Sequence, residues 1–92
     1  MEIKQGNNQK KHRDISQNEF LTEVVEASKK LLVIVDFWAP WCGPCKDLGP
    51  RIEKIVSQAN DKVTLVKINI DENQELAAQL QIQSIPTVLA FK

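Results

Sequence analysis

The chain has 92 residues, enough for one domain but not for two, because independent domains cluster near about 100–150 residues. Twelve Lys and Arg residues balance twelve Asp and Glu residues, so the net charge does not favour nucleic acid or anionic lipid as a partner. Hydrophobic residues make up 42% and charged residues 26%, close to the globular average, which excludes the disordered and fibrous classes.

Residues 1–12 are polar and predict a flexible leader, with one domain over residues 13–92. The basic cluster at residues 10–13 has no neighbouring aromatic residue that could stack on bases, so we interpret it as a solvated arm. The longest apolar run, Leu31 to Val35, is far shorter than the roughly 20 residues that cross a bilayer. Since the first twenty residues also lack an apolar signal region, we expect a cytoplasmic protein with no membrane partner.

Helical and strand patterns alternate along the rest of the chain. After a possible short strand at 13–16, apolar residues at helical spacing predict a helix over 17–29, started by Ser16 or Asn18. Residues 31–38 are β-branched, aromatic and nearly continuous in hydrophobicity, as expected of a central strand buried on both faces.

The remaining pattern predicts a helix from Pro44 to Ala59, kinked at Pro50, and then a strand, a short helix and a last strand at 63–70, 73–80 and 87–91. Such alternation indicates an α/β fold with a mixed or parallel sheet.

The two cysteines lie in the segment WCGPCK, at the junction of the central strand and the long helix. A helix N-terminus presents unpaired N–H groups and a partial positive charge, which favour a thiolate over a thiol. Two intervening residues allow the sulfurs to reach disulfide distance, with Pro44 restricting the loop and Gly43 permitting close approach. The pattern favours Cys42 as nucleophile and Cys45 as resolving thiol.

Two structural alternatives remain for this pair. A zinc site needs four ligands, and beyond the two cysteines the chain offers only His12 in the polar tail. A purely structural disulfide would close a very short loop, which adds little to stability.

Asp36 interrupts the apolar central strand, where an unpaired carboxylate would cost several kcal/mol. One alternative is a carboxylate satisfied by backbone N–H groups or placed at a strand edge. The functional interpretation is a carboxyl of raised pKa that exchanges a proton with Cys45. Lys67 on the adjacent strand is a candidate charge partner, although it could equally be an exposed lysine.

Residues 35–46, VDFWAPWCGPCK, resemble the active-site strand and loop of the thioredoxin family, and the resemblance continues through Pro50, KINID at 67–71 and IPT at 85–87. It extends from about residue 14 to the end of the chain. It implies a thioredoxin-like fold, a mixed central sheet flanked by helices, and a protein-disulfide reductase that needs no cofactor or metal.

Specific roles follow from the resemblance. Cys42 would attack a substrate disulfide, Cys45 would resolve the mixed disulfide, and Asp36 would assist Cys45. Pro86 would be a cis-proline facing the cysteines, and Ile85 would offer backbone hydrogen bonds to an extended substrate. An apolar rim formed by Trp41, Gly43 and Pro44 would meet that substrate.

The implied partners are protein disulfides and a thioredoxin reductase. Segments such as DLGP at 47–50 and LAAQL at 76–80 are also similar to the thioredoxin domain of co-chaperones that carry tetratricopeptide repeats. This resemblance gives an alternative function, a redox-active module that binds a chaperone or unfolded proteins.

The resemblance also bears on the C-terminal part of the fold. Thioredoxins continue past the strand at 87–91 with a hairpin, another strand and a closing helix, so we expect a domain that lacks these last elements. We expect 87–91 to be an exposed edge strand, open to pairing with another chain.

Overall fold

The computed structural model describes residues 12–92, which form an α/β fold around a four-stranded sheet in the order β1-β3-β2-β4. The strands are β1 (His12–Asp14), β2 (Leu32–Trp38), β3 (Val63–Asn69) and β4 (Thr87–Phe91). β1 and β2 both run parallel to β3, whereas β4 runs antiparallel to β2, so the predicted mixed sheet is confirmed. The predicted leader lies outside the described residues except for His12, which is the first residue of β1.

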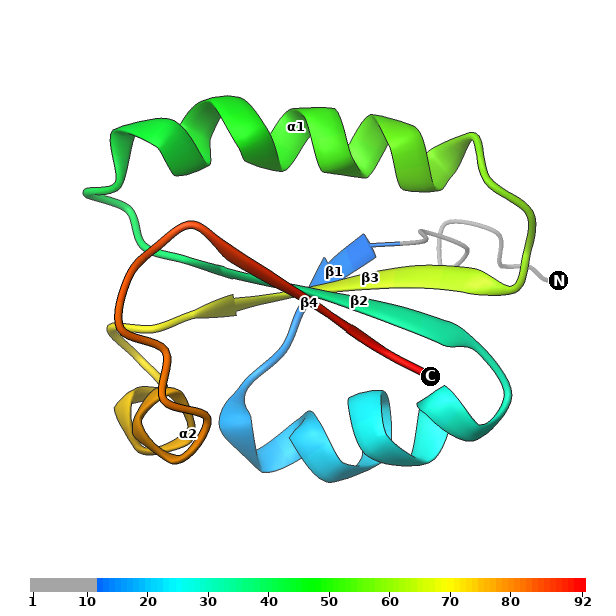
Figure 1. Ribbon diagram of the computed structural model, residues 1–92, viewed down its shortest axis with the longest axis horizontal. Helices are drawn as coiled ribbons and strands as arrows, with labels where there is room; N and C mark the ends of the chain where they lie inside the picture. Colours follow the sequence, from blue (N-terminus) through cyan, green and yellow to red (C-terminus); the bar gives the residue numbers. More distant parts are fainter. Residues whose placement is uncertain (1–11) are drawn as a thin grey trace, which may run out of the picture.

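Both faces of the sheet are covered. In Figure 1 the long helix α1 (Gly43–Ser57) lies along one face, while α2 (Gln74–Gln79) and the helical segment of residues 17–29 lie on the other. β2 is the central strand, and its Val33, Val35 and Phe37 side chains are completely buried. The continuous hydrophobicity of β2 therefore reflects the helices that cover both faces of the sheet, as the sequence predicted.

The first helical segment covers the predicted residues but is not the regular α-helix that the spacing indicated. It consists of a 3₁₀ turn η2 (Gln17–Glu19), a π-type segment η3 (Leu21–Glu26) and a second 3₁₀ turn η4 (Ala27–Lys29). β-branched residues lose side-chain freedom in an α-helix, so this part of the chain has a weak intrinsic preference for one. Val24 is fully buried in the core whereas Leu21 is 63% exposed, so one side of the segment packs against the rest of the fold.

The start of this segment is joined to α2 by a pair of reciprocal hydrogen bonds. The backbone N–H of Gln17 donates to Asn73 Oδ1 at 2.7 Å, and the backbone N–H of Leu76 donates to Gln17 Oε1 at 3.0 Å. Asn73 is only 4% exposed and also donates from Nδ2 to the carbonyl of Asn69 at 2.8 Å. Asn73 is the N-cap of α2, but its side-chain oxygen accepts the N–H of Gln17 in the other helical segment.

The basic cluster is not the solvated arm that the sequence suggested, as far as it is described. His12 and Arg13 belong to β1, which pairs with β3. The Arg13 guanidinium contacts the carboxylate of Glu23, and His12 Nε2 lies 4.0 Å from Glu53 Oε1. Lys10 and Lys11 lie outside the described residues.

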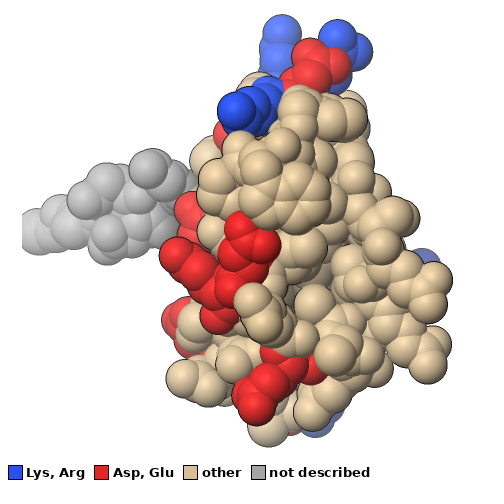
Figure 2. All heavy atoms as spheres, turned by 90° about the vertical axis from the view of Figure 1, so that its left-hand side faces the viewer, with Lys and Arg blue, Asp and Glu red and all other residues tan. Residues whose placement is uncertain are grey.

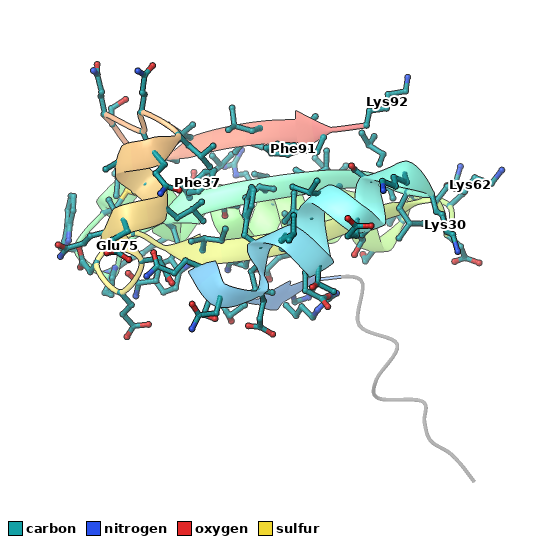
Figure 3. All side chains as sticks on the ribbon, turned by 90° about the horizontal axis from the view of Figure 1, so that it is seen from below. Lys30, Phe37, Lys62, Glu75, Phe91 and Lys92 are labelled. Atoms are coloured by element: carbon teal, nitrogen blue, oxygen red, sulfur yellow. A yellow bond between two sulfur atoms is a disulfide. The ribbon has the colours of Figure 1, made fainter. Side chains whose placement is uncertain are left out.

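β4 forms the edge of the sheet next to β2, as predicted, and Val88 on it is 41% exposed. Figure 3 looks onto the other face of the sheet, where Phe91 on β4 and Phe37 on β2 belong to one apolar cluster with Val24 and Leu76 of the helical layer. Phe91 packs edge-on against Phe20 with ring centroids 5.6 Å apart. Over residues 12–92, no helix is long and apolar enough to span a membrane.

Candidate active site

Cys42 and Cys45 form a disulfide at the N-terminus of α1, with their Cα atoms 5.3 Å apart. Cys42 is the N-cap residue, and its Sγ accepts the backbone N–H of Cys45 at 3.2 Å. Pro44 occupies the first turn, where its missing N–H leaves no helical bond unmade. Unpaired N–H groups and the helix dipole therefore act directly on Cys42, the conditions that stabilise a thiolate.

An apolar shell surrounds the disulfide. Cys42 and Cys45 are 4% and 6% exposed, Ala39 is fully buried beside them, and Ile85 packs against the same cluster. The Ile85–Pro86 peptide bond is cis, as the resemblance implied. Through its packing against this cluster, Ile85 lies next to the cysteines although it is some forty positions further along the chain.

The surface around the disulfide is open and mostly uncharged. Figure 2 looks onto this end of the molecule and shows a broad face without charged side chains, with acidic groups along one margin. Trp41 is 66% exposed, and its Nε1 donates to Asp71 at 2.9 Å, which holds the indole at the rim. A Cβ on Gly43 would meet nothing within 4 Å, so no close approach within the chain requires this glycine, and its open side is available to a partner.

Asp36 is buried on β2, only 2% exposed, and its Oδ1 has no hydrogen-bond partner among the described residues. Loss of solvation raises the pKa of this carboxyl above its usual range. The Lys67 ammonium lowers the pKa in part, whereas the carboxylates of Glu53 and Asp14 raise it further. The strand-edge alternative is excluded, because β2 has a neighbouring strand on each side.

A cavity of about 270 Å³ between α1 and the sheet joins Asp36 to the disulfide. Its walls contain Asp36, Trp38, Ala39, Pro40, Cys45, Lys46, Pro50, Glu53 and Lys67. Cys45 lines this cavity, whereas Cys42 does not. Cys45 is therefore the cysteine that shares this cavity with the buried carboxyl.

Lys67 lies opposite Asp36 in the β2–β3 register, as the sequence suggested, but its ion pair is with another residue. Lys67 Nζ lies 2.6 Å from Glu53 Oε2, and it also stands 5.6 Å from the centre of the Trp38 ring. Sequence reasoning missed Glu53. The signal was its spacing: Cys45, Gly49 and Glu53 follow one another at intervals of four along α1 and so share a helix face.

Comparison with known proteins gives the family. The family model described as Thioredoxin matches residues 11–92. The chain belongs to the thioredoxin family. It is 51% identical over 73 residues to thioredoxin 1 of Synechococcus elongatus, 44% over 78 residues to thioredoxin 1 of Nostoc sp., and 47% over 79 residues to thioredoxin of Rickettsia prowazekii.

These alignments cover 79%, 85% and 86% of this chain, but only 66%, 71% and 73% of the three relatives. Membership identifies the Cys42–Cys45 pair as the redox-active disulfide of a thiol–disulfide oxidoreductase. Because the relatives are thioredoxins, the comparisons favour this function over the co-chaperone alternative.

Proposed function

We propose that this thioredoxin-family chain reduces disulfides in other proteins, with Cys42 as the attacking thiol and Cys45 as the resolving thiol. The observation that carries the assignment is the asymmetry of the pair. Cys42 Sγ accepts an N–H bond at the helix N-terminus, while Cys45 lines the cavity that contains Asp36.

The first step uses the reduced pair. The Cys42 thiolate attacks one sulfur of the substrate disulfide, so a Cys42–substrate bond forms, the substrate S–S bond breaks, and one substrate sulfur leaves as a thiolate. The N–H of Cys45 and the dipole of α1 stabilise the thiolate before it attacks.

In the second step, Cys45 becomes the nucleophile. Its thiol gives a proton to the Asp36 carboxylate across the cavity, and the resulting thiolate attacks Cys42 Sγ. The Cys42–Cys45 disulfide forms as the mixed disulfide breaks, and the second substrate sulfur leaves and takes up a proton. Two electrons pass from the dithiol to the substrate. The raised pKa makes Asp36 a stronger base than an ordinary carboxylate, and the Lys67 side chain lines the same cavity.

Substrate binding is assigned to the uncharged face around the disulfide. Trp41, Gly43 and Pro44 form one side of this face, and Ile85 and Pro86 form the other. Exposure of Trp41 and the open space over Gly43 support contact with a protein surface. The backbone of Ile85 would bond to an extended segment that carries the substrate disulfide.

The same proposal includes a thioredoxin reductase as the source of electrons, a cytoplasmic location, and residues 13–92 as the functional domain. It does not extend to chaperones or unfolded proteins, because the relatives are thioredoxins.

Trapping of the mixed disulfide tests the assignment. Cys45→Ser removes the second nucleophile, so we expect covalent complexes with substrate proteins to accumulate. Cys42→Ser should form none and should lose disulfide reduction, which an insulin precipitation assay measures. Equal trapping by the two variants would contradict the roles given to the two cysteines.

A further inference from the structure

The Lys67 ammonium stands between two carboxylates in the cavity beneath the disulfide. Its Nζ is paired with Glu53 Oε2 at 2.6 Å, and the ion pairs of the described residues do not include one with Asp36. The space between Lys67 and Asp36 is the site of Gly49. A Cβ built there would lie 3.5 Å from Lys67 Nζ and 4.0 Å from Asp36 Oδ2, so both groups border the same point.

We propose that Glu53 is a positioning residue that holds the Lys67 ammonium away from Asp36 and so keeps Asp36 a strong proton acceptor for Cys45. The inference deepens the proposed function, on which the role of Cys45 rests. Glu53 itself touches neither the disulfide nor the reacting atoms.

The physical basis of this proposal is competition between Asp36 and Glu53 for the Lys67 ammonium. A carboxylate that is hydrogen-bonded to an ammonium gives up basicity, because the ion pair favours its charged form. Asp36 Oδ1 has no such partner among residues 12–92, while Glu53 has one at short distance. The negative charge of Glu53 also offsets the positive charge of Lys67, which weakens the pull of the lysine on Asp36.

The lysine is able to change partners. The Lys67 and Glu53 side chains are 20% and 25% exposed, so their pair is not sealed from solvent. No Cβ at Gly49 obstructs the space between Lys67 and Asp36. Removing Glu53 therefore leaves Asp36 as the remaining carboxylate beside the lysine in this cavity.

β1, α1 and β3 also place other charged groups near Asp36 or in the same cavity. β1 contributes Asp14, which raises the pKa of Asp36, and His12, which lies 4.0 Å from the other Glu53 oxygen. α1 contributes Lys46 and Glu53 to the cavity wall, and β3 contributes Lys67. β4 pairs with Asp36 through the uncharged Val88. Among the charged groups of residues 12–92, Glu53 is the one that both pairs with Lys67 and belongs to the helix that carries Cys45.

The test follows the Asp36 carboxyl directly, by ¹³C NMR titration of the oxidised protein. Glu53→Gln should lower the titration midpoint of Asp36. The matched control is Asp47→Asn, which removes the same charge from α1 at a side chain that is 73% exposed and paired with Arg51. The control should leave the midpoint where it is in the parent chain.

A Lys67→Gln chain separates the positioning effect of Glu53 from the direct effect of its charge on the Asp36 midpoint. If Glu53 acts through the lysine, the drop caused by Glu53→Gln should be much smaller in a Lys67→Gln chain than in the parent chain. An equal drop in both backgrounds, no drop in the parent, or the same drop in the Asp47 control would overturn the proposal.

A kinetic measurement connects the titration to the reaction. The rate at which Cys45 resolves a preformed mixed disulfide should show its pH dependence displaced downward in Glu53→Gln, in step with the Asp36 midpoint. A profile that stays unchanged while the midpoint moves would contradict the link to Cys45. Failure of the trapping experiment would refute the cysteine roles and leave the NMR result standing, so the two failures are distinguishable.

Discussion

Replacement of Asp36 by Ala should stabilise the folded protein while impairing its reaction. The carboxyl is 2% exposed and one of its oxygens has no hydrogen-bond partner in residues 12–92. Its removal leaves no other buried charge without a partner, because Lys67 remains paired with Glu53 at 2.6 Å. The vacated volume adjoins the existing cavity of about 270 Å³, so no tightly packed apolar core is opened.

An unsatisfied buried polar group costs about 1–3 kcal/mol, and a charged group costs more. We therefore expect the free energy of unfolding of Asp36→Ala to exceed that of the parent by about 1–3 kcal/mol at pH 8. For a domain of this size each kcal/mol raises the thermal midpoint by roughly 4–8 °C.

The gain should depend on pH in a defined direction. Burial raises the pKa of Asp36 in the folded state above the unfolded value of 3.8. Below that value the carboxyl is protonated in both states and the penalty for its charge vanishes. The native state binds this proton more tightly than the unfolded state. The charged carboxyl therefore opposes folding increasingly as pH rises from the unfolded pKa to the folded-state pKa. The stabilisation by Asp36→Ala should thus be larger at pH 8 than at pH 3.

Urea unfolding of the oxidised proteins at both pH values measures the difference, with Asp47→Ala as an exposed control. Disulfide reduction by Asp36→Ala should fall, because the resolving step loses its base. A variant less stable than the parent at both pH values would refute the reasoning and show that Asp36 makes a net favourable structural interaction.

Two further substitutions test the fold. Asn73→Ala should lower the free energy of unfolding by about 2 kcal/mol, because it leaves the N–H of Gln17 without a partner, and urea unfolding measures the loss. Gly49→Ala should raise it by about 0.5–1 kcal/mol through helix propensity, since the new Cβ meets Lys67 Nζ at an ordinary contact distance of 3.5 Å. A lower thermal midpoint in Gly49→Ala would mean that the cavity tolerates no added methyl group.

Much of the fold could be predicted because hydrophobic patterning and chain order constrain it strongly. The central strand was expected at 31–38 and observed as β2 at Leu32–Trp38, and the last strand was expected and found at 87–91. The helix at 17–29 is located correctly, but its hydrogen bonds are not those of the regular α-helix that the spacing indicates. Periodicity reports which residues face the core, whereas the choice between α, 3₁₀ and π bonding depends on tertiary packing.

Some features of the candidate site could likewise be predicted from the sequence, and others could not. The cysteine pair and the buried Asp36 could be identified locally, since a short motif and a charge within an apolar strand are visible in sequence. The ion-pair partner of Lys67 could not be predicted from the sequence, because the choice between Asp36 and Glu53 depends on the distance between α1 and the sheet. The hydrogen bond that the Asn73 side chain accepts from Gln17, 56 residues away, also requires the folded arrangement.

The reciprocal bonds of Gln17 with Asn73 and Leu76 have a consequence for the order of folding. Each helical segment supplies a hydrogen-bonding group that the start of the other one lacks, so neither start is complete until both are in place. During synthesis Gln17 emerges well before its partner, since 56 positions separate them. The N–H of Gln17 therefore lacks this partner until most of the sheet has been made, and closure of the contact joins early and late parts of the chain in a single cooperative event.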